Sequence, residues 1–408
     1  MPSTRTRHTR TTPPPAARRT HRALTLAALL LLAANLRAAI TGVPPVLDTL
    51  QTAFHLTGTQ VSVLTTLPVL CLGAFAPAAP ALARRTSTET VLAAACTLTL
   101  AGILTRTFPT PAALFTGTLL AGAGIALGNV LMPAVVKRHF PDRVGTMTGL
   151  TMTLMAATGA LAAGLAVPLT TYAGWREALT LWAVPATAAG AVWTLLATRR
   201  TRQRPETTGT AGTATARPSV LRSPLAWAVA ALLGIVSLCF YVLVAWTPDI
   251  MRDQGYPAAE AGAMTSLMLT VGIPLGLAVP VAATRVTDQR PLVAAVIALK
   301  AAGLSGILLA PQHAWVWTGV LGIAIGAAFP LAMTLLSLRS PDPATAARLS
   351  AMAQTGGYLL AGCGPAAIGI LHTFTGSWHT PLLLLITLTV PELAVGLVAA
   401  RPGFVGAR

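Results

Sequence analysis

Charged residues are scarce in this sequence, and acidic residues are the scarcest of them. Only 10% of the 408 residues are charged, with 11 Asp and Glu against 28 Lys and Arg. Soluble domains carry about 25% charged residues, so the composition excludes an ordinary soluble fold. With 54% hydrophobic residues and a mean hydropathy of +0.69, the sequence indicates a protein with many membrane-spanning segments.

Motifs for metal binding, disulfide formation and catalysis are also missing. The four cysteines lie inside apolar runs, and none has a CxxC or Cys/His partner at metal spacing. We interpret them as small hydrophobic residues and expect no disulfide, metal or other cofactor. The sequence contains no HExxH and no nucleotide-binding motif. The peptide GLSG at 303–306 matches a pattern of intramembrane serine proteases, but such short matches are common in apolar helices, and we expect no enzyme.

Apolar segments of bilayer-spanning length recur along the whole chain. A helix needs about 20 residues to cross the hydrocarbon core. Twelve segments of this kind are present: 23–43, 59–82, 89–106, 111–136, 145–170, 177–198, 223–247, 261–283, 291–310, 314–338, 348–371 and 381–400. Pro44 and Pro45 are predicted to end the first span, and Pro248 the seventh. The expected fold is an all-α polytopic membrane protein with twelve transmembrane helices.

Polar stretches divide these spans into two groups of six. Residues 1–22 are rich in Arg, Thr and Pro and are predicted to form a disordered cytoplasmic tail. Residues 199–222 have the Gly, Thr, Pro and Arg content of a flexible linker. We therefore expect one six-helix bundle at 23–198, a second at 223–400, and a short cytoplasmic tail at 401–408.

The basic residues predict the orientation of the chain. If the N-terminus is cytoplasmic, the inner segments hold 23 of the 28 Lys and Arg, and the outer segments hold only Arg106, Arg176 and Arg252. This bias follows the positive-inside rule. It predicts that the protein lies in the inner membrane of the cell with both termini in the cytoplasm. The positive charge then indicates contact with the anionic lipid of the bilayer and no nucleic-acid site.

The two groups of spans also repeat. Residues 124–133 read GIALGNVLMP and residues 322–330 read GIAIGAAFP, 198 residues apart and in the fourth span of each group. Two six-helix halves related by a parallel repeat are typical of transporters that rock around a site between the halves. The closely spaced glycines favour close helix packing.

Arg37 is the leading candidate for a ligand-binding residue. It lies within the apolar run LLLLAANLRAAIT at 29–41, about 14 residues into the first span. A cation there costs about 2.5–3.5 kcal/mol on insertion scales, so it should face protein or a water-filled cavity. Its planar guanidinium can hold a small anion through two parallel hydrogen bonds. The alternative is an arginine that reaches a lipid headgroup or ties two helices together.

Five further residues are candidates for contact with a substrate. Tyr241 and Trp246 in the seventh span can stack on a planar ligand, although Trp246 also fits an interfacial aromatic belt. Gln354 and Tyr358 lie four residues apart on the eleventh span and can hydrogen-bond a substrate or another helix. Asn129 in the fourth span is predicted mainly to bond between helices, with substrate contact as the alternative.

Lys300 and Glu392 are predicted to form a structural ion pair. Lys300 lies about ten residues into the ninth span and Glu392 about twelve into the last, which puts both near the middle of the membrane. Unpaired charges at this depth are costly, so the two side chains are expected to meet. A proton relay is the alternative function for this pair.

Several stretches resemble one branch of a known transporter family. They are NLRAAITGVPPVL, LTTLPVLCLGAFAPAAPALARR, GNVLMPAVVKRHFPDRVGTMTGL, GWREALTLWA and SAMAQTGGYLLAGCGPAAIGILHTFTGSW. They are similar to the cyanate and nitroimidazole transporters of the major facilitator superfamily, with the most specific segments at 128–150 and 350–378. The resemblance implies a secondary transporter that moves a small anionic or planar solute by alternating access, with protons as the expected coupling ion. Export of nitroimidazole-like drugs is the alternative function, and a channel or an intramembrane enzyme is a more distant one.

Overall fold

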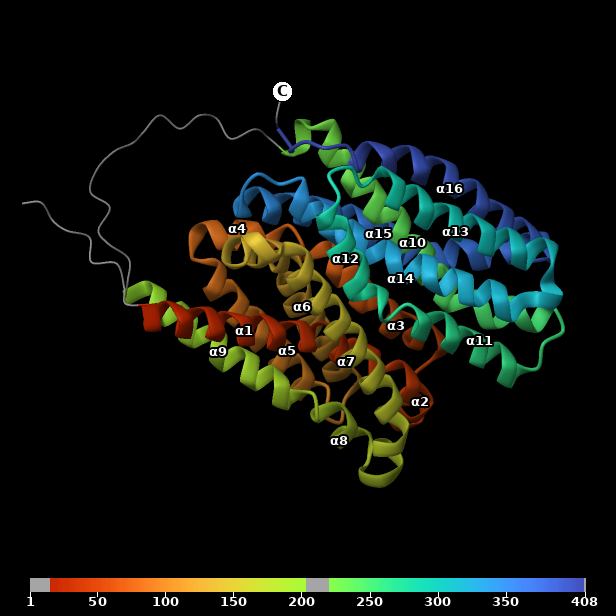
Figure 1. The fold of residues 1–408 in the computed structure, drawn as a ribbon. Coiled ribbons are helices and arrows are strands. Elements are labelled where there is room, and N and C mark those ends of the chain that lie inside the picture. Colours follow the sequence, from red (N-terminus) through yellow and green to blue (C-terminus); the bar gives the residue numbers. More distant parts are fainter. Residues whose placement is uncertain (1–14, 203–219, 407–408) are drawn as a thin grey trace, which may run out of the picture.

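The computed structural model describes residues 15–202 and 220–406, and within these ranges the protein is entirely helical. Figure 1 shows the helices of the N-terminal half side by side with those of the C-terminal half. The predicted tail at 1–14 and most of the predicted linker, 203–219, lie outside the described residues. The first helix begins at Pro15, inside the segment that the sequence predicts to be tail.

Each half is a chain of helices joined by short turns. The N-terminal half contains α1 (Pro15–Thr41), α2 (Leu47–Phe54), α3 (Gly58–Ala74), α4 (Ala78–Arg85), α5 (Thr88–Thr105), α6 (Pro111–His139), α7 (Val144–Ala173), α8 (Trp175–Thr180) and α9 (Ala183–Arg202). The C-terminal half contains α10 (Pro224–Asp253), α11 (Ala258–Val271), α12 (Leu275–Arg285), α13 (Arg290–Leu309), α14 (Ala314–Leu338), α15 (Pro343–Thr375) and α16 (His379–Ala399).

The span count agrees with the sequence. Eleven segments of the described chain are long and apolar enough to cross a membrane, and twelve when α3 and α4, bent by 48° to each other, form one span. Polar caps set several helix starts. Thr57 and Gln60 form a reciprocal capping box before α3, Ser87 accepts a hydrogen bond from the Thr90 N–H before α5, and the Asp342 carboxylate accepts from two N–H groups of α15.

The prediction that Pro248 ends a helix is wrong. The first helix does end, at Thr41, before the Pro44-Pro45 pair, but α10 continues through Pro248 to Asp253. Prolines are tolerated inside transmembrane helices because neighbouring helices and Ser or Thr hydroxyls satisfy the backbone groups that proline leaves free. Thr247, just before Pro248, donates its hydroxyl to the Leu243 carbonyl one turn earlier.

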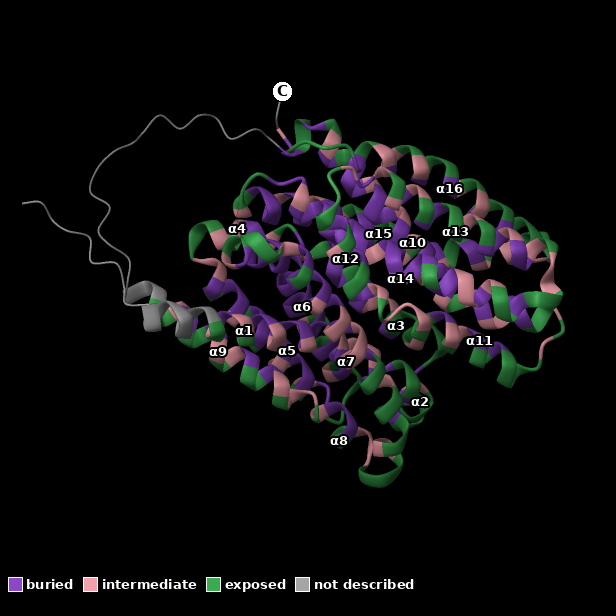
Figure 2. Ribbon diagram, in the orientation of Figure 1, coloured by how far each residue is buried: buried purple, intermediate pink, exposed green. Residues whose placement is uncertain are grey.

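The repeated glycine segments lie on the most buried spans. In the apolar windows of α6 and α14, 83% and 72% of the residues are buried, more than in any other described span. Figure 2 shows this burial along the middle of the molecule. The glycines of α6 and α14 allow neighbouring segments to approach these helices closely. A Cβ added at Gly124 would lie 2.4 Å from the Ala95 carbonyl oxygen, and one at Gly326 would lie 2.2 Å from Gly272 Cα. The glycines therefore serve helix packing, as their spacing predicts.

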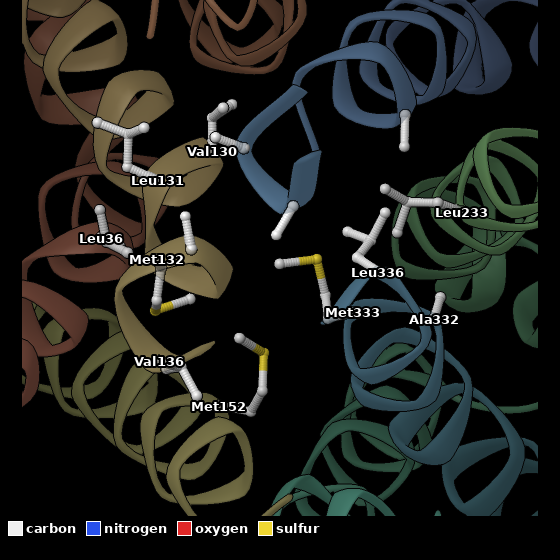
Figure 3. Close-up of a cluster of buried hydrophobic side chains, with 14 of the residues drawn as sticks. Leu36, Val130, Leu131, Met132, Val136, Met152, Leu233, Ala332, Met333 and Leu336 are labelled. Carbon is white, nitrogen blue, oxygen red and sulfur yellow. The ribbon is translucent and has the colours of Figure 1, made fainter. Parts of the chain in front are cut away.

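The two halves share an apolar core at only one end. We call this the linker end, where α9 ends at Arg202 and α10 begins at Pro224. Here Met132, Val136 and Met152 of the N-terminal half belong to the same cluster of buried side chains as Met333 and Leu336 of the C-terminal half (Figure 3). At the opposite end the halves have separate cores, one within residues 43–179 and the other within residues 239–385.

One side-chain hydrogen bond crosses between the halves at the linker end. Lys137 in the last turn of α6 donates its Nζ to the Ser337 carbonyl oxygen in the last turn of α14, at 2.8 Å. A cation next to the carbonyls that end a helix is favourable because they carry partial negative charge. The next residue, Arg138, instead pairs with Glu89 of its own half at 3.6 Å. The apolar core and this bond together close the linker end.

We expect the glycine contact between α14 and the turn that joins α11 to α12 to be essential for stability. Gly326→Ala should destabilise the protein by about 1–3 kcal/mol, because the added methyl group overlaps Gly272. Gly319→Ala on the same helix is the matched control, since no atom lies within 4 Å of its added Cβ. Thermal unfolding of the detergent-purified variants checks this. Equal melting temperatures for the two variants would contradict the packing argument.

Candidate functional site

Arg37 projects from α1 toward the C-terminal half. Its guanidinium carbon lies 5.7 Å from the centre of the Phe240 ring on α10, within cation–π range. The side chain is half-buried, and among the described residues its guanidinium has no hydrogen bond or ion pair. The end of α1 is fixed by Thr41, whose hydroxyl donates to the Gly159 carbonyl of α7 at 2.9 Å. The charge is thus held between the two halves without a carboxylate partner.

Two tyrosines share the surroundings of Arg37. Arg37 is near enough to Tyr241 on α10 and Tyr358 on α15 for its charge to act on both side chains, and Tyr241 acts in the same way on Tyr358. The Tyr241 ring also meets Phe240 edge to face, with centroids 5.4 Å apart. Within the described chain neither hydroxyl donates to a protein group. Arg37, Phe240, Tyr241 and Tyr358 therefore form one group, which we call the seam site.

Gln354 and Asn129 meet across the same seam. Gln354 on α15 is fully buried and donates its Nε2 to the backbone carbonyl of Asn129 on α6 at 3.3 Å and to Ser350 Oγ at 2.7 Å. Asn129 is also buried, 4% exposed. Gln354 lies one helical turn from Tyr358 on α15, on the linker-end side. These residues form the floor of the seam site.

Trp246 is not brought to this group. Its indole N–H donates to the Pro365 carbonyl at 2.8 Å, and its ring lies 5.3 Å from that of Trp378. A Cβ at Gly369 of α15 would meet the indole at 2.7 Å. Its contacts thus join α10 to other helices of the C-terminal half. Five residues along an α-helix turn a side chain by about 140°, so Tyr241 and Trp246 face different neighbours.

Two residues of this region were missed from the sequence. Phe240 had no distinguishing signal beside Tyr241, because sequence alone does not fix the rotation of α10. Arg106 was assigned to an outer segment, yet it is 2% exposed at the end of α5 and donates to the Ala39 carbonyl at 2.6 Å. It holds α1 two residues beyond Arg37. In the structure Arg106 packs against Gly117, where an added Cβ would lie 2.7 Å from Arg106 Cγ, and no sequence pattern indicated this contact.

The enzyme-like peptide at 303–306 has a packing role. A Cβ at Gly306 would lie 2.1 Å from the Trp317 ring, and one at Gly303 would lie 2.7 Å from Leu321, so both glycines bring α13 against α14. No group of three or more His, Cys, Asp or Glu residues in the described ranges could hold a metal ion. The polar group with open hydrogen-bonding capacity between the halves is the seam site.

The comparison with known families identifies this arrangement. The model of the Major Facilitator Superfamily matches residues 28–365. The chain belongs to the Major Facilitator Superfamily. It is therefore a multi-pass membrane transporter, and the predicted family and fold class are confirmed.

Two curated relatives of this transporter lie in the predicted branch. The chain is 39% identical to the 2-nitroimidazole transporter of Escherichia coli (strain K12) over 386 residues, which cover 93% of this chain and 96% of the relative. It is 31% identical to the cyanate transport protein CynX of the same strain over 356 residues, 86% of this chain and 91% of the relative. The crystal structure of the E. coli fucose:proton symporter FucP has the same fold, with a TM-score of 0.72 over 94% of this chain and 99% of that chain at 12% identity.

Lys300 and Glu392 of the transporter are in contact behind the seam. Lys300 Nζ on α13 donates to Glu392 Oε2 on α16, and both side chains are at most 2% exposed. Cys239 of α10 lies beside the pair. The pair joins α10, α13 and α16 inside the C-terminal half, away from the N-terminal half. This position favours a structural role, which remains a prediction.

The ion pair can be tested by removing one charge and then both. Lys300→Met should cost about 3–5 kcal/mol of stability, because it leaves the Glu392 carboxylate buried without its partner. The double variant Lys300→Met/Glu392→Leu should recover most of that loss, since no buried charge remains. Thermal unfolding and yield in detergent measure both effects. A single variant as stable as the wild type would show that the pair contributes nothing, and a stable double variant without transport would favour the proton relay.

Proposed function

We propose that this protein is a secondary active transporter that moves a small planar or anionic solute by alternating access. The observation that carries the proposal is the half-buried guanidinium of Arg37, which has an aromatic ring but no anionic partner within the described chain. It lies between two bundles that share a core at one end only. A site at such a seam can be exposed first to one side of the membrane and then to the other.

The seam site suits a ligand with delocalised oxygens or charge at one end. The Arg37 guanidinium carbon lies over the Phe240 ring, and its N–H groups make no hydrogen bond within the described chain, so they can bind a bidentate acceptor. Cyanate is a small anion and 2-nitroimidazole a flat ring with a two-oxygen nitro group. The names of the two relatives thus describe solutes with acceptor atoms that a guanidinium can bind, at the ends of a linear anion in cyanate and in a nitro group in 2-nitroimidazole.

In the proposed orientation the protein lies in the inner membrane of the cell and both termini are in the cytoplasm. It rests on the 23 of 28 basic residues that lie in the segments of the linker end and the termini. In this orientation the shared core and the Lys137–Ser337 bond close the cytoplasmic side. The structure then corresponds to a state in which the site communicates with the outside.

Counterflow in lipid vesicles tests the transport class. Vesicles that contain the purified protein and are preloaded with unlabelled cyanate or 2-nitroimidazole should accumulate the labelled compound transiently without an ion gradient. A channel gives a current or leak without such accumulation, and an intramembrane enzyme gives neither. We also propose proton coupling, because the structural neighbour is named as a proton symporter. An imposed pH gradient should drive net movement.

Export of nitroimidazole-like drugs is the second candidate function. The more similar of the two relatives is named for 2-nitroimidazole. The sign of the pH-driven movement decides between the two directions. Accumulation inside right-side-out vesicles that are more acidic outside supports uptake by symport, and extrusion under the same gradient supports export.

Arg37 should be required for binding. Arg37→Gln should weaken apparent affinity in counterflow by about 10- to 150-fold, because a hydrogen bond to a charged group contributes about 1.5–3 kcal/mol. Arg37→Lys should lose less, since it keeps the charge but not the two-pronged geometry. Thermal stability should stay close to that of the wild type, because no described ion pair is broken.

Arg176→Gln is the matched control for this experiment. Arg176 also lies over an aromatic ring, 4.5 Å from the centre of the Trp175 ring, but it is outside the seam site and donates to Thr107. Its loss should leave affinity unchanged. Transport that is equally affected in both variants would contradict a binding role specific to Arg37.

A further inference from the structure

Gln354 has one hydrogen-bonding atom without a partner. Its Nε2 donates to the Asn129 carbonyl and to Ser350 Oγ. The backbone carbonyl can only accept, so the amide must turn its Nε2 toward α6 and cannot be flipped. Its Oε1 is therefore the remaining atom, and it is buried with no hydrogen-bond partner. The geometry leaves a free acceptor, not a free donor, at the floor of the seam site.

An unpaired acceptor of this kind is costly. A buried polar atom left without a partner costs about 1–3 kcal/mol, and water is scarce inside a membrane. The Gln354 side chain is 0% exposed and lies in contact with α6, the helix of the opposite half. A group that donates a hydrogen bond to Oε1 would recover this free energy at the place where the two halves meet.

The position of Gln354 relative to Arg37 gives the direction of such a ligand. Tyr358, which shares the surroundings of Arg37, is four residues further along α15. Four residues of helix rise about 6 Å, so Gln354 lies about that far toward the linker end from the level of Tyr358. A ligand with one ring that is bound to Arg37 at one end is long enough to reach this level with its other end.

We infer that Gln354 selects substrates that carry an N–H or O–H donor at the end opposite the oxygens bound by Arg37. The inference rests on the proposed function and narrows its substrate class to flat rings with a nitro or carboxylate group at one end and a donor at the other. Because Oε1 is covered in this structure, the bond forms as the halves move around the bound substrate. The donor thus becomes a requirement for transport through the full cycle.

Matched pairs of compounds test this selection in counterflow. The pairs are 4-nitroimidazole with 1-methyl-4-nitroimidazole, and 4-hydroxybenzoate with 4-methoxybenzoate. In each pair methylation removes a donor that lies across the ring from the nitro or carboxylate oxygens. Wild-type protein should transport the donor compound of each pair at least about tenfold more efficiently, the ratio that corresponds to about 1.4 kcal/mol. Gln354→Met, similar in length but unable to accept this bond, should bring the ratio close to one.

Thr355→Val is the control variant. Thr355 is the next residue on α15, and its hydroxyl donates only to the Ala351 carbonyl of its own helix at 2.7 Å. This variant should keep the wild-type ratio. If a trapped water satisfies Oε1 instead, Gln354→Met changes both compounds of a pair by the same factor, and the inference is overturned.

If Gln354→Met does not fold, the wild-type protein alone still tests whether substrates with a donor are selected. Equal transport of both compounds in both pairs overturns the role of Gln354 while the proposed transport function stands. Absence of counterflow with all four compounds overturns the substrate class. Absence of counterflow with cyanate and 2-nitroimidazole as well defeats the proposed function itself.

Discussion

A guanidinium without a carboxylate is the feature on which the arrangement of this transporter depends. Arg37 costs free energy in an apolar helix unless its surroundings satisfy it. Here α1 presents it to the Phe240 ring across the seam, while Thr41 and Arg106 fix the end of α1 from its other neighbours. The protein thus fixes the backbone that carries the charge and leaves the N–H groups open, which is the condition for binding a solute at that point.

The distribution of apolar packing places Arg37 between the end of the molecule where the two halves share a core and the end where their cores are separate. Membrane helices gain little hydrophobic free energy from packing on each other, so close backbone contact at glycines and a few hydrogen bonds determine which faces stay together. At the linker end, methionines of both halves pack into one cluster (Figure 3), and Lys137 donates to the end of α14. Methionine side chains are flexible and adapt to different neighbours. A methionine-rich contact can therefore separate and re-form at low cost, as the proposed alternating access requires.

The large-scale fold was predictable from the sequence because hydrocarbon imposes a fixed length on apolar helices. The six-and-six division and the packing role of Gly124 and Gly326 follow from the same constraint and from the repeat. The prediction that a helix ends at Pro248 failed because proline ends helices in water more reliably than in a membrane. There, neighbouring groups satisfy the backbone atoms that proline leaves free. Within the site, Arg37 was visible as a charge in an apolar run. The contact of Phe240 with Arg37 and the orientation of Trp246 away from the site were not visible. Both depend on the rotation of α10 about its axis, which no local pattern fixes.

The contrast between the buried Lys300 and the half-buried Arg37 supports the proposal that one cation is structural and the other binds the solute. Lys300 and Glu392 neutralise each other at the back of the C-terminal half, so this pair is complete and has no need of a solute. Arg37 and the Gln354 Oε1 atom lie toward the seam, and each lacks a protein partner. The Arg37 guanidinium is a positively charged hydrogen-bond donor and Gln354 Oε1 is an acceptor, so the two can bind complementary groups of one molecule. In this proposal the chemical character of the solute depends on which hydrogen-bonding groups the fold leaves open, and not on the presence of charge as such.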